Sequence, residues 1–577
     1  MNSTLQLWNN YPGKGETAAR LVREKVASRI AKGDSSVFSF SAEAQDFAER
    51  FTGWTHLASQ PIADFDAIVD FAIKIRNRGL KRVILIGQGG STQAAMTVTK
   101  LNDPNKTGVE FSTMDMLSPL YVRQILAKTP MEHTLFIVSS KSGTTLETTC
   151  IANVCWKYVA DELGEENVGE HFVAITDPGT ALEEIAKKHN FLACFHSPVN
   201  VGGRFSALTT FTLLPAALVG IDIRRWLYEA VPFEHACGED SLENPAIQLA
   251  GFLYDCYKHG RNKVSLFSPQ PGRVFGLWVE QLIAESLGKE VKGILPQIEI
   301  DAHLLSRNYK DRSLIIYRIY EDDTFPLELA HISSHIPTLE FCLNDVYKLS
   351  SYFLIWEYAT TFLGYLLKVN PFDQPDVQAT KTSTRLLLEE LMSHGGSKKN
   401  SAFKATSDGT LFAKSDFDVD QNSIIDDELD SLDHALEAFF RTLHRGNYFV
   451  FAAYLPFTGE ARRKQLEIIR NEVANRISIP ACLEIGPRYL HSTGQLYKGG
   501  FEGGSYLIVS SDEQNDLQVP GRGFSLGDVQ MCEAHGDFIA LKSRNRNVMH
   551  VHLKGNSPEE LKCLADRVCA AIDRALM

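Results

Sequence analysis

The sequence predicts an α/β protein whose parallel sheets are covered by helices on both faces, which gives three αβα layers. Short apolar runs such as Arg82–Ile86 and Leu135–Ser139 alternate with longer segments whose apolar residues recur at helical spacing. Loops rich in glycine and serine follow both runs, where a strand should lead into a helix. A chain of 577 residues exceeds what one hydrophobic core supports, so we expect two or three domains.

Residues 1–75 are predicted to form a helical N-terminal cover, because apolar residues recur at helical spacing through Ala18–Ile30 and Ile62–Ile75. A first sheet is predicted within residues 76–240, where strands and helices alternate. Its strands are expected at Arg82–Ile86, Val109–Ser112, Leu135–Ser139, Phe172–Thr176 and Phe191–Phe195, and its helices at Leu120–Ala127, Thr145–Leu163 and Leu182–His189. Ligands of such sheets bind beyond the carboxyl ends of the strands.

A second α/β domain is predicted over residues 241–392. Its expected elements are helix Pro245–Tyr257, strand Lys263–Phe267, a helix within Trp278–Pro296, strand Leu314–Tyr317 and helix Tyr352–Leu367. Residues 393–429 are polar and are predicted to be a linker or excursion. Residues 430–577 are predicted to form a C-terminal α/β region, with strands at Tyr448–Tyr454, Ala481–Ile485, Ser505–Ser510 and Met549–His552.

The composition, with 44% hydrophobic and 22% charged residues, is that of a soluble globular chain. The net charge is −13 and no long basic run is present, so we expect no nucleic-acid partner. The N-terminus lacks the features of a secretion signal and Tyr352–Val369 is interrupted by Glu357, so we expect a cytoplasmic protein with no membrane partner. The ten cysteines show no zinc-type spacing and are expected to be buried, reduced thiols.

The stretch from Thr134 to Thr149 combines a predicted strand, a turn and a helix start. Its turn contains four hydroxyl residues, Ser140, Ser142, Thr144 and Thr145. Hydroxyls and free N–H groups therefore converge at the positive end of a helix dipole, which favours a bound phosphate. The alternative is an ordinary helix cap in which Glu147 belongs to a capping box, but one cap needs only one hydroxyl.

Two further glycine-rich turns are candidates for ligand contact. GQGGS, Gly87–Ser91, lacks the third glycine of a dinucleotide fingerprint, so contact with a sugar or phosphate is favoured. In VGGRFS, Val201–Ser206, adjacent glycines let the backbone approach a ligand, and Arg204 adds a permanent cation. The alternative for this second turn is a connecting loop with a surface arginine.

Candidates for acid–base chemistry lie further along the chain. Gln281 and Glu285 are four residues apart and share a helix face, which Gly288 can end, although most helical glutamates are simply solvated. Lys381 is expected in the first turns of a helix that follows Pro371 and Pro375. The turn-rich segment GPRYLHSTGQLYKGG, residues 486–500, contains His491.

Five motifs occur in a fixed order: GQGGS, SSKSGTTLET, VGGRFS, EQLIAESLGK and NPFDQPDVQATK. Together they resemble the phosphoglucose isomerase family, most closely the isomerase half of bacterial fused transaldolase/phosphoglucose isomerase proteins. No (βα)₈ barrel precedes them, so we expect the transaldolase half to be absent. The resemblance implies tandem sugar-isomerase (SIS) domains, at residues 76–240 and 241–392, with an additional C-terminal α/β region, and a homodimer.

The resemblance also implies roles for the substrate-binding residues. Ser140, Ser142 and Thr145, with the Lys141 backbone, match the family's phosphate-binding loop, in which Thr144 also lies. Gly90 with Ser91 matches the turn that contacts the sugar. Gln281 matches the glutamine one turn before the catalytic base.

The catalytic roles follow in the same way. Glu285 matches the base, Arg204, preceded by Gly203, matches the arginine that stabilises the enediolate, and Lys381 matches the lysine that contacts the substrate near ring opening. One carboxylate can carry a proton from C2 to C1 of an aldose beside a fixed cation, so neither a metal nor another cofactor is expected.

One family feature has no counterpart at the usual place. The catalytic histidine of a TNGQHAF-type segment should lie between Glu285 and Lys381, but the corresponding helix reads KLSSYFLIWEYATT. His491, in LHSTGQ after the lysine, is the candidate for ring opening. The alternatives are that His491 only bonds its own turn, or that Lys381 opens the ring alone.

We therefore expect an enzyme that interconverts glucose 6-phosphate and fructose 6-phosphate through a cis-enediolate, in glycolysis and gluconeogenesis. The alternative is a regulatory protein that binds sugar phosphates without converting them, since a fold does not prove activity. A base is unnecessary in a pure binder, so Glu285, Arg204 and Lys381 favour the enzyme. An amidotransferase-type isomerase would need an N-terminal cysteine domain, which the N-terminus does not offer.

Overall fold

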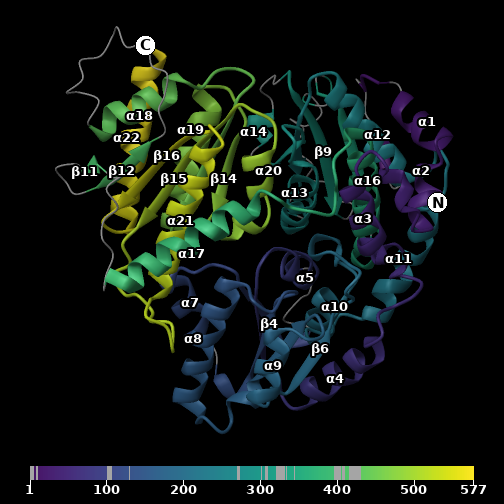
Figure 1. The fold of residues 1–577 in the computed structure, drawn as a ribbon, viewed down its shortest axis with the longest axis horizontal. Helices are drawn as coiled ribbons and strands as arrows, with labels where there is room; N and C mark the ends of the chain where they lie inside the picture. Colours follow the sequence, from purple (N-terminus) through teal and green to yellow (C-terminus); the bar gives the residue numbers. More distant parts are fainter. Residues whose placement is uncertain are drawn as a thin grey trace. The chain divides into compact units, whose positions relative to one another are not determined.

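The computed structural model describes residues 5–7, 11–13, 15–100, 107–128, 130–268, 273–299, 302–305, 310–319, 332, 334, 336–343, 345–394, 404–405, 410–414 and 431–577 (Figure 1). The chain divides into two compact units. Unit 1 comprises Met1–Asp115, Lys128–Gln374 and His491–Leu496. Unit 2 comprises Met116–Ala127, Pro375–Leu490 and Tyr497–Met577.

The first sheet of unit 1 has five parallel strands in the order β3-β2-β4-β5-β6. Its strands are β2 (Arg82–Gly87), β3 (Glu110–Met114), β4 (Thr134–Ser139), β5 (Phe172–Thr176) and β6 (Ala193–His196). Its helices include α5 (Gln93–Lys100), α8 (Leu146–Leu163), α9 (Ala181–Lys188) and α10 (Thr210–Leu218). Every residue of β2, β4 and β5 is buried, as expected for parallel strands covered on both faces. The predicted alternation of strands and helices is confirmed here.

The second sheet of unit 1 has the order β1-β10-β9-β7-β8. Its parallel strands are β7 (Lys263–Phe267), β8 (Leu295–Glu299), β9 (Arg312–Ile319) and β10 (Thr338–Leu343), and β1 (Leu5–Leu7) pairs with β10 antiparallel. Its helices are α11 (Ile223–Cys237), α12 (Pro245–Lys258), α13 (Arg273–Leu287), α14 (Ala302–Leu305) and α16 (Leu349–Leu367). Sequence periodicity missed β8 and β10, because short buried strands lack the alternation of half-exposed ones.

The N-terminal segment is mostly helical, as predicted. Its helices are α1 (Glu16–Arg23), α2 (Val26–Ala31), α3 (Ala42–Phe51) and α4 (Phe65–Asn77), and their apolar faces join the common core of unit 1. The prediction of helices throughout residues 1–75 is wrong at β1. A three-residue strand is too short to give a periodic signal, and its partner β10 lies more than 300 residues away in sequence.

Unit 2 is built on a third sheet with the order β11-β12-β16-β15-β13-β14. Its strands are β11 (Lys404–Ala405), β12 (Leu411–Lys414), β13 (Tyr448–Tyr454), β14 (Ala481–Ile485), β15 (Gly504–Ser511) and β16 (Asn547–Leu553). The helices are α7 (Pro119–Leu126), α17 (Val377–His394), α18 (Leu432–Arg441), α19 (Glu460–Arg476), α21 (Leu526–Ser543) and α22 (Pro558–Leu576). Figure 1 shows α17 lying beside α21, against which it packs.

Within the predicted linker or excursion at 393–429, residues 404–405 and 411–414 form β11 and β12, so a plain linker is wrong for these residues. Leu411, Phe412 and Ala413 are buried, and β12 pairs antiparallel with the edge of β16. Pairing covers the open edge of a parallel sheet, which explains a strand within a polar stretch. Residues 395–403, 406–409 and 415–430 lie outside the described residues.

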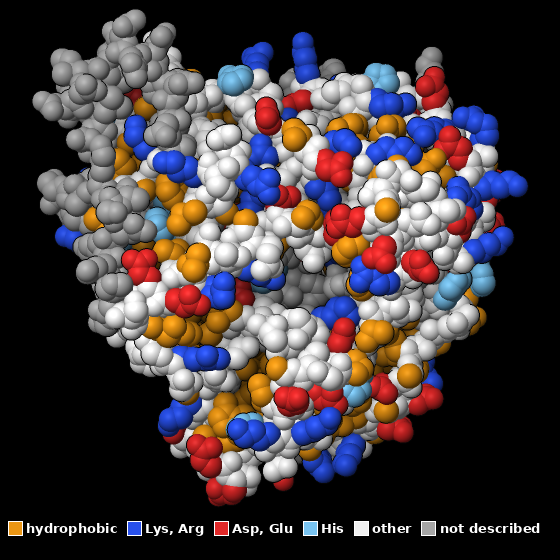
Figure 2. All heavy atoms as spheres, viewed as in Figure 1, with side chains coloured by type: hydrophobic (Ala, Val, Ile, Leu, Met, Phe, Trp, Pro, Cys, Tyr) orange, Lys and Arg blue, Asp and Glu red, His pale blue; other side chains and the backbone are white. Residues whose placement is uncertain are grey.

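All ten cysteines are free thiols, but the prediction that all are buried is wrong: Cys342 and Cys563 are exposed, and Cys194 and Cys569 are half-buried. No helix within the described residues is long and apolar enough to cross a membrane. On the face drawn in Figure 2, acidic and basic side chains are interspersed.

Candidate active site

The loop between β4 and α8, residues 140–145, is bonded internally through its own hydroxyl groups; we call it the phosphate loop after the role predicted for it. The buried Ser140 Oγ lies 3.0 Å from Thr145 Oγ1 and accepts from the Gly143 N–H at 3.1 Å. Ser142 Oγ accepts from the N–H and the hydroxyl of Thr144, at 3.3 and 3.2 Å, and both side chains are exposed. The polar groups thus gather at the start of an 18-residue helix, where an anion is favoured.

The ordinary capping interpretation of this loop is wrong. Thr145 occupies the N-cap position of α8, but its side chain makes no capping hydrogen bond, so Glu147 forms no capping box. The Lys141 ammonium is turned to the Asp177 carboxylate at 2.7 Å and donates to the Pro198 carbonyl at 3.3 Å. Only the backbone of Lys141 therefore remains for a role in the loop, as expected.

The GQGGS turn lies against the end of β4, directly before the phosphate loop, and against the VGGRFS turn. Ser139 Oγ, at the end of β4, donates to the Ser91 carbonyl at 3.2 Å, and Ser206 Oγ donates to the Gly90 carbonyl at 3.3 Å. Gly203 leaves open space at its α-carbon. One region is therefore bordered by the carboxyl ends of β2 and β4 and by the VGGRFS turn. The neighbouring positions of β2 and β4 in the sheet predict that their ends meet there.

Glu285, on α13, lies beside a buried cation. Its Oε1 is 3.3 Å from Arg204 NH1, and its side chain is 13% exposed. Its Oε2 accepts from Gln281 Nε2 at 3.1 Å, which confirms that the two residues share a helix face. The solvated-glutamate alternative is wrong, because this carboxylate is mostly buried and is held by an arginine and an amide.

Arg204 is fixed by the turn that follows α16. Its NH2 group donates to the carbonyls of Pro371 and Asp373, at 2.7 and 2.8 Å, while Nε donates to Ser286 Oγ at 2.8 Å. Burial lowers the pKa of Arg204, and the charges of Glu285 and Asp373 oppose this shift. The alternative in which Arg204 is a surface arginine of a connecting loop is therefore wrong.

Lys289, the last residue of ESLGK, holds the same turn from the other side. Its ammonium donates to the carbonyls of Asn370 and Asp373, at 2.5 and 2.6 Å, and to the Asp373 carboxylate. Burial, followed by the nearby charge of Arg204, lowers the pKa of Lys289 to about 8. Arg204 and Lys289, both buried, thus fix residues 370–373. The carbonyls of these residues hold Arg204 next to Glu285.

His491 joins this group from a distant part of the chain. Its Nε2 lies 2.5 Å from Glu147 Oε1, and its carbonyl accepts from Gln281 Nε2 at 2.9 Å. A side chain at Gly89 would come within 2.6 Å of the same carbonyl, so the glycine permits the close approach. The alternative in which His491 bonds only its own turn is therefore wrong.

The segment after His491 reaches the end of α13. Gln495 Nε2 donates to the Gly288 carbonyl at 3.0 Å, and a β-carbon at Gly288 would lie 2.4 Å from the Leu496 α-carbon. Gly288 follows the last residue of α13 directly, as predicted. The glycine of ESLGK is thus required to admit the backbone of Leu496, in the segment that begins with His491.

Lys381 is the one predicted catalytic residue outside this group. It is the fifth residue of α17, in unit 2, and its side chain is exposed. The helix is anchored within its own unit, where Thr380 Oγ1 donates to Asp537 at 3.3 Å. The role of Lys381 stays a prediction.

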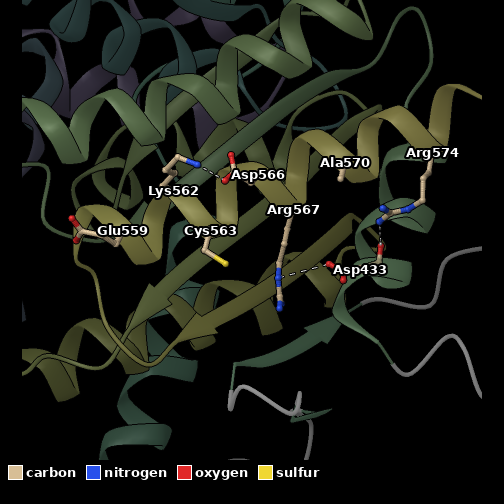
Figure 3. Close-up of a pocket in the computed structure, with 8 residues that line it drawn as sticks. All are labelled: Asp433, Glu559, Lys562, Cys563, Asp566, Arg567, Ala570 and Arg574. Atoms are coloured by element: carbon tan, nitrogen blue, oxygen red, sulfur yellow. Dashed lines mark hydrogen bonds and ion pairs between the residues drawn. The ribbon is translucent and has the colours of Figure 1, made fainter.

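Outside the candidate site, a surface groove of about 420 Å³ runs along α22 in unit 2 (Figure 3). Its charged side chains pair with one another: Lys562 with Asp566 at 2.6 Å, and Arg567 with Asp433 at 3.9 Å. Such exposed pairs leave little net charge for a ligand. Across the described part of the chain, no group of three or more His, Cys, Asp or Glu side chains is placed to hold a metal ion.

Parallel sheets of this strand order covered by helices, with a hydroxyl-rich loop after β4 and a carboxylate–arginine contact between α13 and the VGGRFS turn, are those of an α/β protein of the sugar-isomerase class. The family model for phosphoglucose isomerase matches residues 73–302. The glucose-6-phosphate isomerase of Mycoplasmopsis pulmonis is 32% identical over 389 residues, which are 59% of this chain and 90% of that protein. The chain belongs to the phosphoglucose isomerase family.

Solved structures support the fold. A hypothetical protein from Thermus thermophilus superposes with a TM-score of 0.55 at 24% identity, covering 66% of this chain and 99% of its own. A glucose-6-phosphate isomerase from Chlamydia trachomatis gives 0.53 at 15% identity, covering 65% and 85%. Both leave about a third of the chain uncovered. Lys381 and His491 lie beyond the range that the family model matches.

Sequence reasoning missed three residues of this site: Glu147, Lys289 and Asp373. Each lies within a motif that was recognised, namely TLET, ESLGK and NPFDQP. A carboxylate in the first turn of the helix after an anion loop would repel the anion, and this conflict could have indicated that Glu147 has a partner elsewhere in the chain.

Proposed function

We propose that the protein catalyses the reversible isomerisation of glucose 6-phosphate and fructose 6-phosphate. The observation that carries the proposal is the buried contact between Glu285 and Arg204, 3.3 Å apart and braced by Gln281. A protein that only binds sugar phosphates needs the phosphate loop but has no use for a carboxylate beside a fixed cation. Membership of the phosphoglucose isomerase family supports the same interpretation.

The proposed proton transfer uses one carboxylate. Glu285 takes the proton from C2 of the open-chain aldose, and the oxygen at C1 gains negative charge in the enediolate. The proton of the C2 hydroxyl passes to this oxygen and Glu285 returns its proton to C1, which leaves a carbonyl at C2. Arg204 supplies fixed positive charge beside this path, where a preorganised cation stabilises the developing oxyanion. Gln281 Oε1 is buried without a hydrogen-bond partner among the described residues, so it can accept from a substrate hydroxyl.

The substrate phosphate is assigned to residues 140–145, with Ser140, Ser142, Thr144 and Thr145 as hydroxyl donors. Gly90, Ser91 and Gly203 are assigned to the sugar, because their turns border the same region. A dianion at the start of α8 gains both hydrogen bonds and the helix dipole.

Ring opening is assigned to His491. Histidine titrates near neutral pH and can pass a proton between the ring oxygen and the C1 hydroxyl. Glu147 holds one ring nitrogen at 2.5 Å, which orients the imidazole and leaves the other nitrogen for the substrate. Lys381 is proposed to contact the substrate near the same step. We also propose a homodimer in the cytoplasm, where hexose phosphates are metabolised.

Nuclear magnetic resonance with the purified protein tests the proposal. Glucose 6-phosphate should convert to fructose 6-phosphate, and the reverse reaction should reach the same ratio. Activity should survive EDTA, because the assigned groups need no metal; a loss that a divalent ion restores would point to another mechanism. Saturable binding of both sugar phosphates without conversion would favour the regulatory alternative.

A further inference from the structure

The third sheet repeats the strand order of the other two. Its parallel strands β14-β13-β15-β16 run second, first, third and fourth in chain order, as do β3-β2-β4-β5 and β8-β7-β9-β10. In this order the winding reverses between the first and third strands, and ligands bind in the crevice beyond the carboxyl ends there. In the first sheet that crevice is bordered by GQGGS and the phosphate loop. The third sheet has the corresponding crevice beyond β13 and β15.

A pocket of about 420 Å³ lies at the same edge of the third sheet in unit 2, beside the loops that follow β15 and β16. It is lined by Leu120, Arg123, Arg462, Glu513, Gln514, Asn515, Asn556 and Ser557. Arg462 lies in the first turn of α19, which follows β13, and Glu513–Asn515 and Asn556 belong to the loops after β15 and β16. Leu120 and Arg123 come from α7. The pocket therefore contains none of the residues assigned to isomerisation.

Both arginines are anchored and keep donors for a ligand. Arg123 donates to the carbonyls of Asn515 and Asp516, at 3.3 and 3.1 Å, and Arg462 donates to the Asn556 carbonyl at 2.8 Å. These bonds engage two N–H groups of Arg123 and one of Arg462, out of five in each guanidinium. A carbonyl fixes the direction of a guanidinium and leaves its charge in place. A carboxylate in the same position would neutralise that charge.

The remaining lining groups suit hydroxyls. Gln514 and Asn515 each offer an amide donor and an acceptor, whereas the Asn556 amide already donates to Ser511 Oγ at 3.1 Å. Burial raises the pKa of Glu513 to about 7, so near neutral pH this side chain offers both a protonated and an ionised form. No aromatic side chain is present among the lining residues that the structure describes, so the pocket offers no stacking surface for a nucleobase. Among the lining side chains two arginines stand against one carboxyl, so the lining carries a net positive charge.

We propose that this pocket is a second ligand site, which binds a small phosphate monoester carrying hydroxyl groups. The phosphate faces Arg123 and Arg462, and the hydroxyls face the amides. The site binds rather than reacts: Ser557, its one hydroxyl, is committed to the capping box of α22 with Glu560. A ligand there ties α7 to the third sheet, and α7 is the helix that precedes β4 and the phosphate loop in the chain.

Calorimetric titration of the whole chain with glycerol 3-phosphate tests the site. The titration uses the Thr145→Asp variant, in which phosphate binding by the phosphate loop is weakened. This variant is still expected to bind one equivalent of glycerol 3-phosphate per chain saturably. Arg462→Leu in this background should weaken that binding roughly 10- to 100-fold, the effect of losing one charged hydrogen-bond donor. Lys554→Leu, an exposed lysine in the loop after β16, is the matched control and should change nothing. Glycerol should not bind, and inorganic phosphate should bind more weakly.

Absence of saturable binding up to about 10 mM, or equal affinities in Arg462→Leu and the control, would overturn the proposal. If Arg462→Leu fails to fold by circular dichroism, Arg123→Gln carries the test, because Arg123 is exposed on α7. Isomerisation by the single variant Arg462→Leu, with Thr145 intact, separates the two proposals, since loss of this site alone is expected to leave basal turnover in place.

Discussion

His491 Nε2 lies 2.5 Å from Glu147 Oε1, although 344 positions separate the two residues in the sequence. The carboxylate belongs to the first turn of α8, directly after the phosphate loop, and the carbonyl of the same histidine accepts from Gln281. His491 is thus held both by the helix that follows the phosphate loop and by the helix that carries Glu285. This geometry supports an acid–base role at the sugar ring.

His491→Ala should lower kcat/KM for cyclic glucose 6-phosphate by roughly 10²-fold or more, the usual size of a lost acid–base group. A four-carbon aldose phosphate that cannot close a ring should be converted at nearly the wild-type rate. Steady-state kinetics on both substrates make the comparison. Glu147→Gln should show the same selectivity, and the exposed His444→Ala is the control. Equal losses on both substrates would remove His491 from ring opening.

Thr145→Asp should raise KM for glucose 6-phosphate at least about tenfold, because a carboxylate at the start of α8 repels the substrate dianion. The matched control is Ser431→Asp, which places the same charge at the N-cap of α18 in unit 2 and should leave KM unchanged. Initial rates over a range of substrate concentrations provide the measurement. An unchanged KM in Thr145→Asp would place the phosphate elsewhere.

Gly288→Ala should reduce kcat strongly, because the added methyl group would lie 2.4 Å from the Leu496 α-carbon and displace the segment that carries His491. Gly276→Ala is the control in the same helix: its methyl group would lie 3.5 Å from Ile298, an ordinary contact, and alanine favours helix. Both variants are assayed for turnover and thermal unfolding. Normal kcat in Gly288→Ala would show that the contact is not needed.

The parts of the site that the sequence predicts are local. Gln281 and Glu285 share a face because helix geometry fixes residues four apart, and residues 140–145 form an anion loop because strand, turn and helix follow one another directly. The fold of parallel sheets follows from the same alternation.

Distant pairings could not be predicted in this way. The TLET motif does not indicate that Glu147 pairs with His491. Likewise, β1 pairs with β10 through three residues that show no periodic pattern. The exposure of Cys342 and Cys563 likewise depends on the tertiary structure, since apolar neighbours in sequence do not ensure burial. Lys289 belongs to the ESLGK motif, but the sequence does not predict its ion pair with Asp373, which depends on the folded turn at residues 370–373.

Unit 2 should lose stability in mild acid because of His535 on α21. Burial lowers the pKa of His535 to about 4, below the ordinary value of 6.5. The unfolded chain therefore binds more protons between these values, so this contribution is present near pH 7 and is lost as the pH falls from about 6.5 towards 4. Between pH 7 and pH 5 the loss should be about 2 kcal/mol.

Urea unfolding of His535→Phe measures this contribution. The free energy of unfolding of the variant should depend on pH less steeply than that of the wild type, whereas the exposed His444→Phe should keep the wild-type slope. A wild-type slope in His535→Phe would show that His535 is not the group that responds. The nearby His550, whose pKa burial also lowers, adds to the slope in both proteins.

The central claim is that Glu285 carries the proton between C2 and C1, and isomerisation in heavy water tests it most directly. Wild-type protein incubated with glucose 6-phosphate in D₂O should place deuterium at C2 of the remaining aldose while fructose 6-phosphate forms. Glu285→Gln, which keeps the size and the amide contacts of the side chain, should lower both turnover and C2 exchange by roughly 10²- to 10⁴-fold with the fold intact. Near-normal turnover with undiminished C2 exchange in Glu285→Gln would contradict the account.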